Sequence, residues 1–233
     1  MAVFFFLFII PQLICIPLKA HRFALRMNYL WTWGFFKLAF IPLQIQWRFS
    51  LDKKQQYILC ANHFSYLDVP ALGLCPLPFK FVGKSQLQKI PLFGLMYRKI
   101  HITVNRSSYR SRAKSLEKAR EAVAQGHNLG IFPEGGIRFS TFPKMTKFHD
   151  GAFRLATECN VPIIPVTFLD NHYILPDDDR LLFKRKKCRI IFHEPIKGTG
   201  AEEKDIRQLK EKVYRVIQDE LDSHYDFNIE TQA

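Results

Sequence analysis

Short apolar runs alternate with longer mixed segments along the chain from about Gln55 onward. The apolar runs are rich in β-branched or aromatic residues and are bounded by Gly, Pro or Asn, a pattern that predicts strands. Predicted strands occupy residues 57–61, 79–82, 100–104, 128–132, 161–168 and 188–192. Apolar residues that recur at spacings of three and four predict helices over 108–125, 147–159 and 202–223. The alternation favours an α/β domain in which helices cover a sheet.

The first 50 residues follow a different pattern. Residues 3–18 are almost wholly apolar, but Pro11 and Pro17 interrupt this run, and it is shorter than the roughly 20 residues of a spanning helix. A second apolar stretch, residues 29–47, follows a basic segment and contains tryptophans near Lys37. Tryptophan and lysine side chains suit the interface between lipid headgroups and acyl chains.

This pattern predicts an apolar helical membrane anchor over residues 1–50, inserted in one leaflet and held by anionic lipid. The protein would then be a peripheral or monotopic membrane protein on the cytoplasmic face. A pair of core helices, or one tilted span, is the alternative. Residues 51–233 are predicted to form one domain.

The composition limits the kinds of partner. A formal net charge of +13 predicts an anionic partner, which could be a nucleic acid, an acidic membrane surface or a phosphorylated substrate. The five cysteines are scattered and include no Cys-x-x-Cys pair, so we expect reduced thiols in a cytoplasmic setting rather than a disulfide framework or a zinc site.

A histidine and a carboxylate stand close together where the first of these strands gives way to a probable helix, in the segment Asn62–Asp68. On one continuous helix, His63 and Asp68 would point roughly 140° apart. They can meet only if His63 precedes the helix and Asp68 lies in its first turn. Ser65 fits as the N-cap residue, because Ser-x-x-Asp is a capping-type signature.

Other polar residues also stand at the ends of predicted strands. In the segment Phe132–Arg138, two glycines allow the backbone to approach a ligand, Glu134 can accept a hydrogen bond from a hydroxyl group, and Arg138 can bind phosphate. Lys84 and Arg106 each follow directly on a strand. Taken singly, each of these features could be an ordinary turn or a surface charge.

Their order along the chain resembles the glycerophospholipid acyltransferases of the lysophosphatidic acid acyltransferase type. The first block of that family, Asn-His-x-Ser-x-x-Asp, is matched in full by residues 62–68. Its later blocks resemble Lys84 with residues 90–94 and Arg106, then residues 132–135, and then residues 161–166. The third block departs from the family pattern, because Gly136 and Ile137 stand where Thr and Arg are expected. The fold of these enzymes, a mixed, mostly parallel sheet flanked by helices, agrees with the alternation above.

The resemblance implies transfer of a fatty acyl group to the sn-2 hydroxyl of 1-acylglycerol-3-phosphate, which gives phosphatidic acid. It implies that His63 is the general base and that Asp68 orients it. Lys84, Arg106 and Arg138 would hold the phosphate of the acceptor, and Glu134 with Gly135 would position its glycerol part. The partners would be membrane lipid, the lysophosphatidic acid acceptor, and acyl-CoA or acyl carrier protein as acyl donor, with no cofactor, no metal and no nucleic acid.

Two alternatives remain. The acceptor could be another lysolipid or an amino-acid lipid, since the blocks do not specify its headgroup. The chain could also be a non-catalytic basic protein that binds membranes or nucleic acid. A binding module, however, has no need of a histidine and an aspartate at this spacing.

Overall fold

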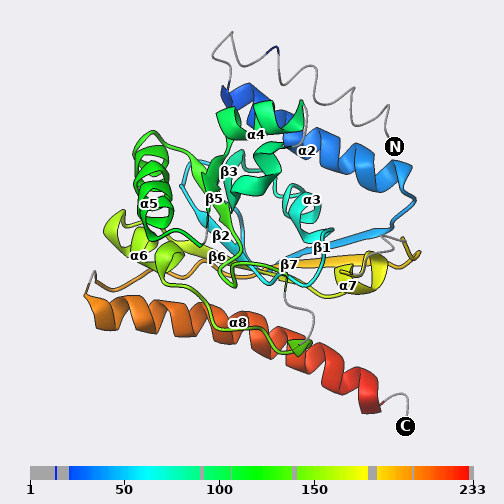
Figure 1. Ribbon diagram of the computed structural model, residues 1–233. Helices are drawn as coiled ribbons and strands as arrows, with labels where there is room; N and C mark the ends of the chain where they lie inside the picture. The colour runs from blue at the N-terminus through cyan, green and yellow to red at the C-terminus, as the bar shows by residue number, and fades with distance from the viewer. Residues whose placement is uncertain are drawn as a thin grey trace. The chain divides into compact units, whose positions relative to one another are not determined.

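The computed structural model describes Ile14 and residues 21–89, 92–105, 107–137, 141–177, 183–200 and 202–230 (Figure 1). The chain divides into two compact units. One unit comprises Met1–Ala39 and Leu72–Gly130, and the other comprises Phe40–Ala71 and Ile131–Ala233. The chain therefore crosses from the first unit to the second, returns to the first, and crosses to the second again.

The strands of the second unit are β1 (Leu43–Trp47), β2 (Ile58–Ala61), β6 (Ile163–Phe168) and β7 (Cys188–Phe192). They lie in the order β1-β7-β6-β2. β1 pairs in parallel with β7, and β2 pairs in parallel with β6, whereas β6 and β7 are antiparallel. β2 and β6 are buried along their whole length, as continuous apolar runs predict.

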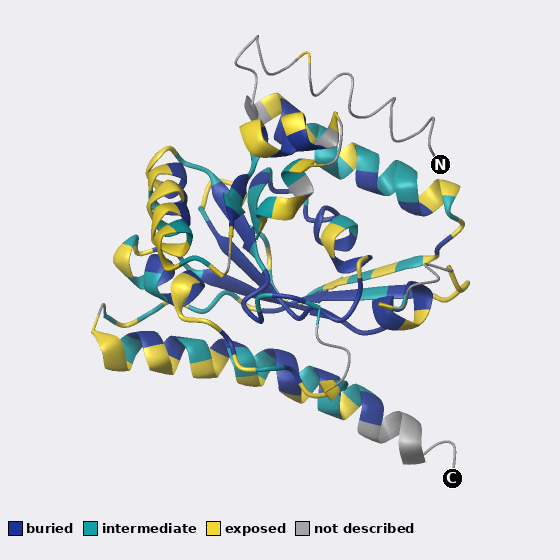
Figure 2. Ribbon diagram, in the orientation of Figure 1, coloured by how far each residue is buried: buried dark blue, intermediate teal, exposed yellow. Residues whose placement is uncertain are grey.

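Helices cover this part of the sheet. The long helix α8 (Glu203–Glu230) packs on β6, and α6 (Gly151–Glu158) packs on both α8 and β2. A stripe of buried side chains runs along α8 (Figure 2) at Ile206, Leu209, Val213, Ile217 and Leu221. The short helix α7 (Asn171–Ile174) follows β6 and contacts β7. Helix α3 (Asp68–Leu72) follows β2.

In the first unit, β3 (Phe79–Lys84) pairs in parallel with β4 (Ile102–Val104), and the order is β5-β3-β4 with β5 at Asn128–Ile131. Helix α5 (Tyr109–Ala124) packs on β4.

The first unit also contains α2 (His21–Leu38), a 3-10 helix, η1 (Ser85–Lys89), and α4 (Phe93–Ile100). α2 packs against α4 through an apolar cluster. Its buried members are Ala24, Leu25, Met96 and Ile100.

The predicted α/β class and the mixed, mostly parallel pairing are confirmed. All six predicted strands and all three predicted helices are present, although α6 begins at Gly151 rather than at residue 147. β1 was missed, because its residues fall in the stretch that was interpreted as lipid-facing. Leu43, Ile45 and Trp47 alternate with two glutamines, which is the period of two that a strand requires.

The anchor prediction falls largely outside the described residues, because residues 1–13 and 15–20 are not among them. Of the helices that the structure does describe, none has the length and apolar content needed to cross a bilayer.

Candidate active site

The segment that follows β2 is tied to the end of β6 by Asn62. Its buried side-chain amide donates from Nδ2 to the backbone oxygen of Phe168 at 3.0 Å and accepts from the backbone N–H of Phe168 at 2.8 Å. Because β2 and β6 are parallel, their carboxyl ends lie at the same edge of the sheet. Asn62 therefore fixes the start of the next turn relative to the neighbouring strand.

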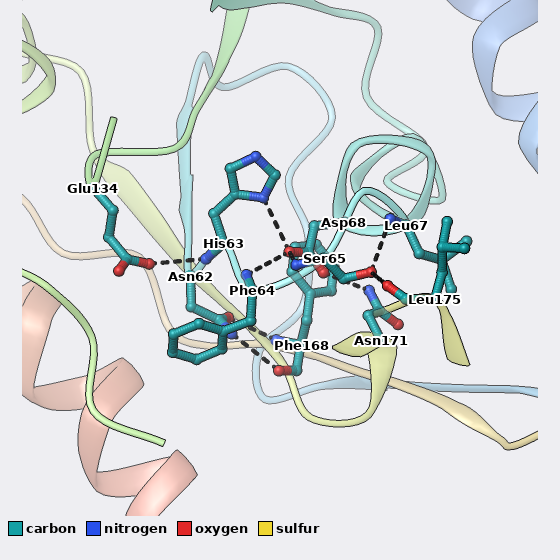
Figure 3. A network of polar contacts seen from close by, with 10 residues as sticks. All are labelled: Asn62, His63, Phe64, Ser65, Leu67, Asp68, Glu134, Phe168, Asn171 and Leu175. Carbon is teal, nitrogen blue, oxygen red and sulfur yellow. Dashed lines mark hydrogen bonds and ion pairs between the residues drawn. The ribbon is translucent and has the colours of Figure 1, made fainter. Parts of the chain in front are cut away.

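His63 and Asp68 meet across this turn (Figure 3). The distance from His63 Nδ1 to Asp68 Oδ2 is 3.0 Å, and both residues are buried. The same oxygen accepts the backbone N–H groups of Phe64 and Ser65, each at 2.8 Å. As expected, His63 precedes α3 and Asp68 begins it.

Ser65 is not the N-cap residue, because α3 begins at Asp68, two residues later than an N-cap at Ser65 requires. Its hydroxyl accepts the backbone N–H of Leu67 at 3.0 Å and donates to the backbone oxygen of Leu175 at 2.6 Å. The Asp68 carboxylate reaches back to the Ser65 N–H in the manner of a capping box. The capping-type contacts thus form in a turn that leads into the helix.

The second oxygen of Asp68 also has a partner. Oδ1 accepts from Nδ2 of Asn171, at the start of α7, at 2.9 Å, and Oδ1 of Asn171 in turn accepts from Cys188 Sγ at 3.0 Å. All three residues are buried. Sequence reasoning missed Asn171 and Cys188. Polar residues that directly follow the apolar strand at 163–168, at the same sheet edge as Asn62, were the available signal for Asn171.

The contacts of Asp68 determine which nitrogen of His63 carries a proton. A carboxylate only accepts hydrogen bonds, so His63 donates from Nδ1, and Nε2 carries the free lone pair. Nε2 points away from the network (Figure 3), and the ring stacks on Phe132 with centroids 4.1 Å apart. Such a nitrogen can take a proton from a hydroxyl group that is brought against it.

Glu134 lies beside the same turn and is buried. Oε1 accepts the backbone N–H of His63 at 2.9 Å, while Oε2 accepts the backbone N–H and the hydroxyl of Thr146 at 2.9 and 3.1 Å. Burial raises the pKa of the Glu134 carboxyl, against the hydrogen bonds from Thr146 and His63, which lower it. Oε1 therefore holds the backbone at His63, while Oε2 ties Glu134 to Thr146.

Gly135 occupies a position that only glycine adopts easily. Its φ is +80°, and a Cβ atom there would lie 3.0 Å from the ring of His149. The backbone N–H of His149 donates to the backbone oxygen of Pro133 at 2.9 Å, which brings the exposed His149 alongside the Pro133–Gly135 turn.

Of the predicted phosphate-binding residues, one belongs to the other unit and two lie outside the described residues. Lys84 is the last residue of β3, in the first unit, and is exposed. Arg106 and Arg138 lie outside the described residues. The structure thus brings together His63, Asp68 and Glu134. Among the described residues, no group of three or more His, Cys, Asp or Glu side chains could hold a metal ion.

A family model described as Acyltransferase matches residues 43–169. The chain belongs to the acyltransferase family. The match begins at β1 and ends just after β6, so it includes the His63 turn and the Glu134 turn.

Curated relatives carry a more specific name. A 1-acyl-sn-glycerol-3-phosphate acyltransferase of Chlamydomonas reinhardtii is 32% identical over 146 residues, which are 62% of this chain and 43% of that protein. A protein of the same name from Saccharomyces cerevisiae is 30% identical over 171 residues, which are 72% of this chain and 56% of that protein. The chain spans about two fifths of the length of the first of these curated relatives.

A solved structure shares the fold. The 1-acyl-sn-glycerophosphate (LPA) acyltransferase PlsC from Thermotoga maritima superposes with a TM-score of 0.72, covering 89% of this chain and 82% of that one. The two sequences are 22% identical, so the likeness concerns the fold alone.

Proposed function

We propose that this acyltransferase moves a fatty acyl group from acyl-CoA or acyl carrier protein to the sn-2 hydroxyl of 1-acylglycerol-3-phosphate, which yields phosphatidic acid. The observation that carries the proposal is the His63–Asp68 pair, 3.0 Å apart, with the second ring nitrogen directed away from its own hydrogen-bond network. The names of the relatives support the choice of acceptor.

An alcohol is a poor nucleophile, so the reaction needs a base at the hydroxyl. His63 Nε2 takes the hydroxyl proton as the acceptor oxygen attacks the thioester carbonyl. The new C–O bond forms, the C–S bond breaks, and the leaving thiolate receives the proton from the imidazolium. Asp68 stabilises that imidazolium through Nδ1. The substrate hydroxyl attacks directly, so no acyl-enzyme forms.

We assign acceptor binding by the family resemblance. Lys84, Arg106 and Arg138 hold the phosphate, and Glu134 with Gly135 positions the glycerol part. A held acceptor presents its hydroxyl to His63 at a high effective concentration, which can contribute several kcal/mol, on the order of 7, to lowering the barrier. Because Glu134 already holds the His63 backbone, any contact that it makes with the acceptor adds to this role.

We further propose that the part of residues 1–50 that precedes β1 holds the protein on the cytoplasmic face of a membrane, as a peripheral or monotopic protein, and that residues 51–233 form the catalytic domain together with β1. α2 supports this, because Phe23, Leu30 and Leu38 are apolar and 58%, 70% and 55% exposed. Arg26 and Lys37 are exposed on the same helix and suit anionic headgroups.

The anchor is tested by substitution, because a deletion through residue 47 would remove β1, which pairs with β7. Phe23→Ser/Leu30→Ser should shift the protein from floating vesicles to the soluble fraction. Tyr109→Ser is the matched control, since Tyr109 is exposed on α5 in the same unit. Equal flotation of both variants would argue against an anchor on α2.

The activity is tested by a product assay with the purified full chain. Lysophosphatidic acid and other lysolipids are offered as acceptors, each with acyl-CoA or acyl carrier protein. The proposal expects phosphatidic acid to be the preferred product, and expects His63→Ala to lower the rate by about 10²–10⁴-fold with fold and membrane binding intact. If the enzyme prefers another lysolipid, lysophosphatidic acid is not its acceptor. Turnover by His63→Ala near the wild-type rate would overturn the mechanism.

A further inference from the structure

The buried side of Asp68 shows a hydrogen-bond chain to which no role has been assigned. It runs from Cys188 Sγ to Asn171 Oδ1, from Asn171 Nδ2 to Asp68 Oδ1, and from Asp68 Oδ2 to His63 Nδ1, at 3.0, 2.9 and 3.0 Å. We propose that Asn171 is a positioning residue for the His63–Asp68 pair, and that Cys188 fixes the direction of the Asn171 amide. The inference rests on the proposed function and concerns how its base is held.

The first step concerns the two oxygens of Asp68. Oδ2 accepts from His63 and from the N–H groups of Phe64 and Ser65, all within one turn. Oδ1 accepts from Asn171, which is 103 positions away in the sequence. Local contacts hold one oxygen, and Asn171 provides the contact from another element that fixes the plane of the carboxylate. A buried carboxylate oxygen that loses its donor is costly, so this contact also stabilises the carboxylate in the orientation that faces His63.

The second step concerns the direction of the Asn171 amide. An asparagine can present either its NH₂ group or its oxygen to a neighbour, and the hydrogen-bond network decides which. Facing the Asp68 carboxylate, an oxygen would place two acceptors together, so the NH₂ group must point there. The amide oxygen then faces Cys188, whose S–H group is a donor.

The third step is that Cys188 stays a thiol. Burial raises the pKa of the Cys188 thiol well above its usual range, and the negative charges of Asp68 and Asp170 raise it further. The S–H donor is therefore retained across the working pH range. Cys188 opens β7, and its backbone N–H donates to the backbone oxygen of Pro42 at 2.8 Å, so the chain of contacts starts on the sheet itself.

The substitution Asn171→Ala tests the proposal. We expect kcat to fall by about 10- to 100-fold while KM changes by less than about twofold, because the base is misaligned and the acceptor contacts are untouched. Asn128→Ala is the matched control. Asn128 is also a buried asparagine, but its Nδ2 donates to the backbone oxygen of Pro78 in the first unit. It should lower the thermal unfolding midpoint while the kcat of the folded protein stays at the wild-type value.

Two substitutions at Cys188 form the second pair of variants. They remove fewer atoms than Asn171→Ala, so they still test the proposal if Asn171→Ala fails to fold. Cys188→Ala should lower kcat by about 3- to 10-fold, and Cys188→Ser, which restores a donor, should recover most of it. Since Cys188 acts through Asn171, the double variant Asn171→Ala/Cys188→Ala should be no slower than Asn171→Ala. Additive losses, or a Cys188→Ser variant no better than Cys188→Ala, would refute the role of Cys188.

An NMR measurement tests the inference without an activity assay. The Nδ1 proton of His63, identified by its loss in His63→Ala, should give a downfield NMR resonance in the wild type. That resonance should shift or broaden in Asn171→Ala and stay in place in Asn128→Ala. An unchanged resonance together with wild-type kcat in Asn171→Ala would overturn the proposal. The proposed function would not be affected by that result, because the His63→Ala assay tests it separately.

Discussion

Asp68 and Glu134 are two buried carboxylates in the same unit, and comparing them distinguishes a catalytic role from a structural one. Each accepts several hydrogen bonds and each contacts His63. Asp68 bonds the imidazole, a side chain that can change its charge. Among the residues that the structure describes, Glu134 bonds the backbone of His63 and the backbone and hydroxyl of Thr146, none of which titrates near neutral pH.

Two similar carboxylates therefore differ in what their charge does. The charge of Asp68 can stabilise a positive imidazolium during turnover, whereas that of Glu134 fixes where the histidine stands. Substitutions that remove each charge should separate the two roles, with catalysis more sensitive at Asp68 and folding more sensitive at Glu134.

The largest effect is expected from Asp68→Asn. Loss of the charge removes the partner of the imidazolium, and an amide at position 68 can place its NH₂ group against the NH₂ group of Asn171. We expect kcat to fall by about 10³–10⁴-fold, as when a catalytic histidine loses its carboxylate partner. Steady-state kinetics on protein checked by circular dichroism measures this. A loss below about tenfold would remove Asp68 from the mechanism.

Arg106→Ala should weaken binding of the acceptor without affecting the chemical step. If Arg106 binds the phosphate, KM for lysophosphatidic acid should rise by about 10- to 100-fold with little change in kcat, because one charge-assisted hydrogen bond is lost. Arg110→Ala, on the exposed surface of α5, is the control. An unchanged KM in Arg106→Ala would exclude Arg106 from the phosphate site.

Glu134→Gln should affect stability more than catalysis. Glutamine has one acceptor oxygen, so its NH₂ group must face an N–H donor, either that of His63 or that of Thr146. We expect a loss of about 1–3 kcal/mol in the free energy of unfolding, measured by urea denaturation, and a smaller relative loss of kcat than in Asp68→Asn. If catalysis fell as far as in Asp68→Asn while stability held, Glu134 would belong to the chemistry.

The last prediction extends the comparison to a buried histidine whose ring bonds a hydroxyl group. His193 is buried and bonds the Thr167 hydroxyl at 2.8 Å. Burial, with the nearby charge of Arg48, lowers the pKa of His193 to about 4. The unfolded chain then binds a proton between about pH 6.5 and pH 4 that the folded chain does not bind, so stability falls as pH falls through this window.

Between pH 7 and pH 5, His193 should account for about 2 kcal/mol of lost unfolding free energy. His193→Asn should flatten the pH dependence of stability in urea titrations by that amount. If the variant showed an equally steep pH dependence, His193 would not be the group that causes the loss of stability.

The sequence predicted the sheet and its main helices because their apolar periods are long and regular. It missed β1 because Trp47, which stacks on Phe192 with centroids 4.0 Å apart, was interpreted as a lipid-facing tryptophan. A single sequence does not distinguish an aromatic side chain that packs on a neighbouring strand from one that faces lipid.

The meeting of His63 with Asp68 followed from local spacing, since both lie within one turn. The contacts of Asn171 and of Glu134 with that turn span 103 and 71 positions. No local pattern encodes contacts of that range, and the Asn171 contact becomes visible only once β2 pairs with β6, the strand that α7 follows.

The most direct test of the central claim is a rapid-quench, single-turnover experiment with a radiolabelled acyl donor. In the wild type, the label should pass from donor to lysophosphatidic acid in one phase, with none on the protein, and in His63→Ala it should stay on the donor. Label that accumulates on the protein before product appears, or transfer by His63→Ala at the wild-type rate, would contradict activation of the acceptor hydroxyl by His63.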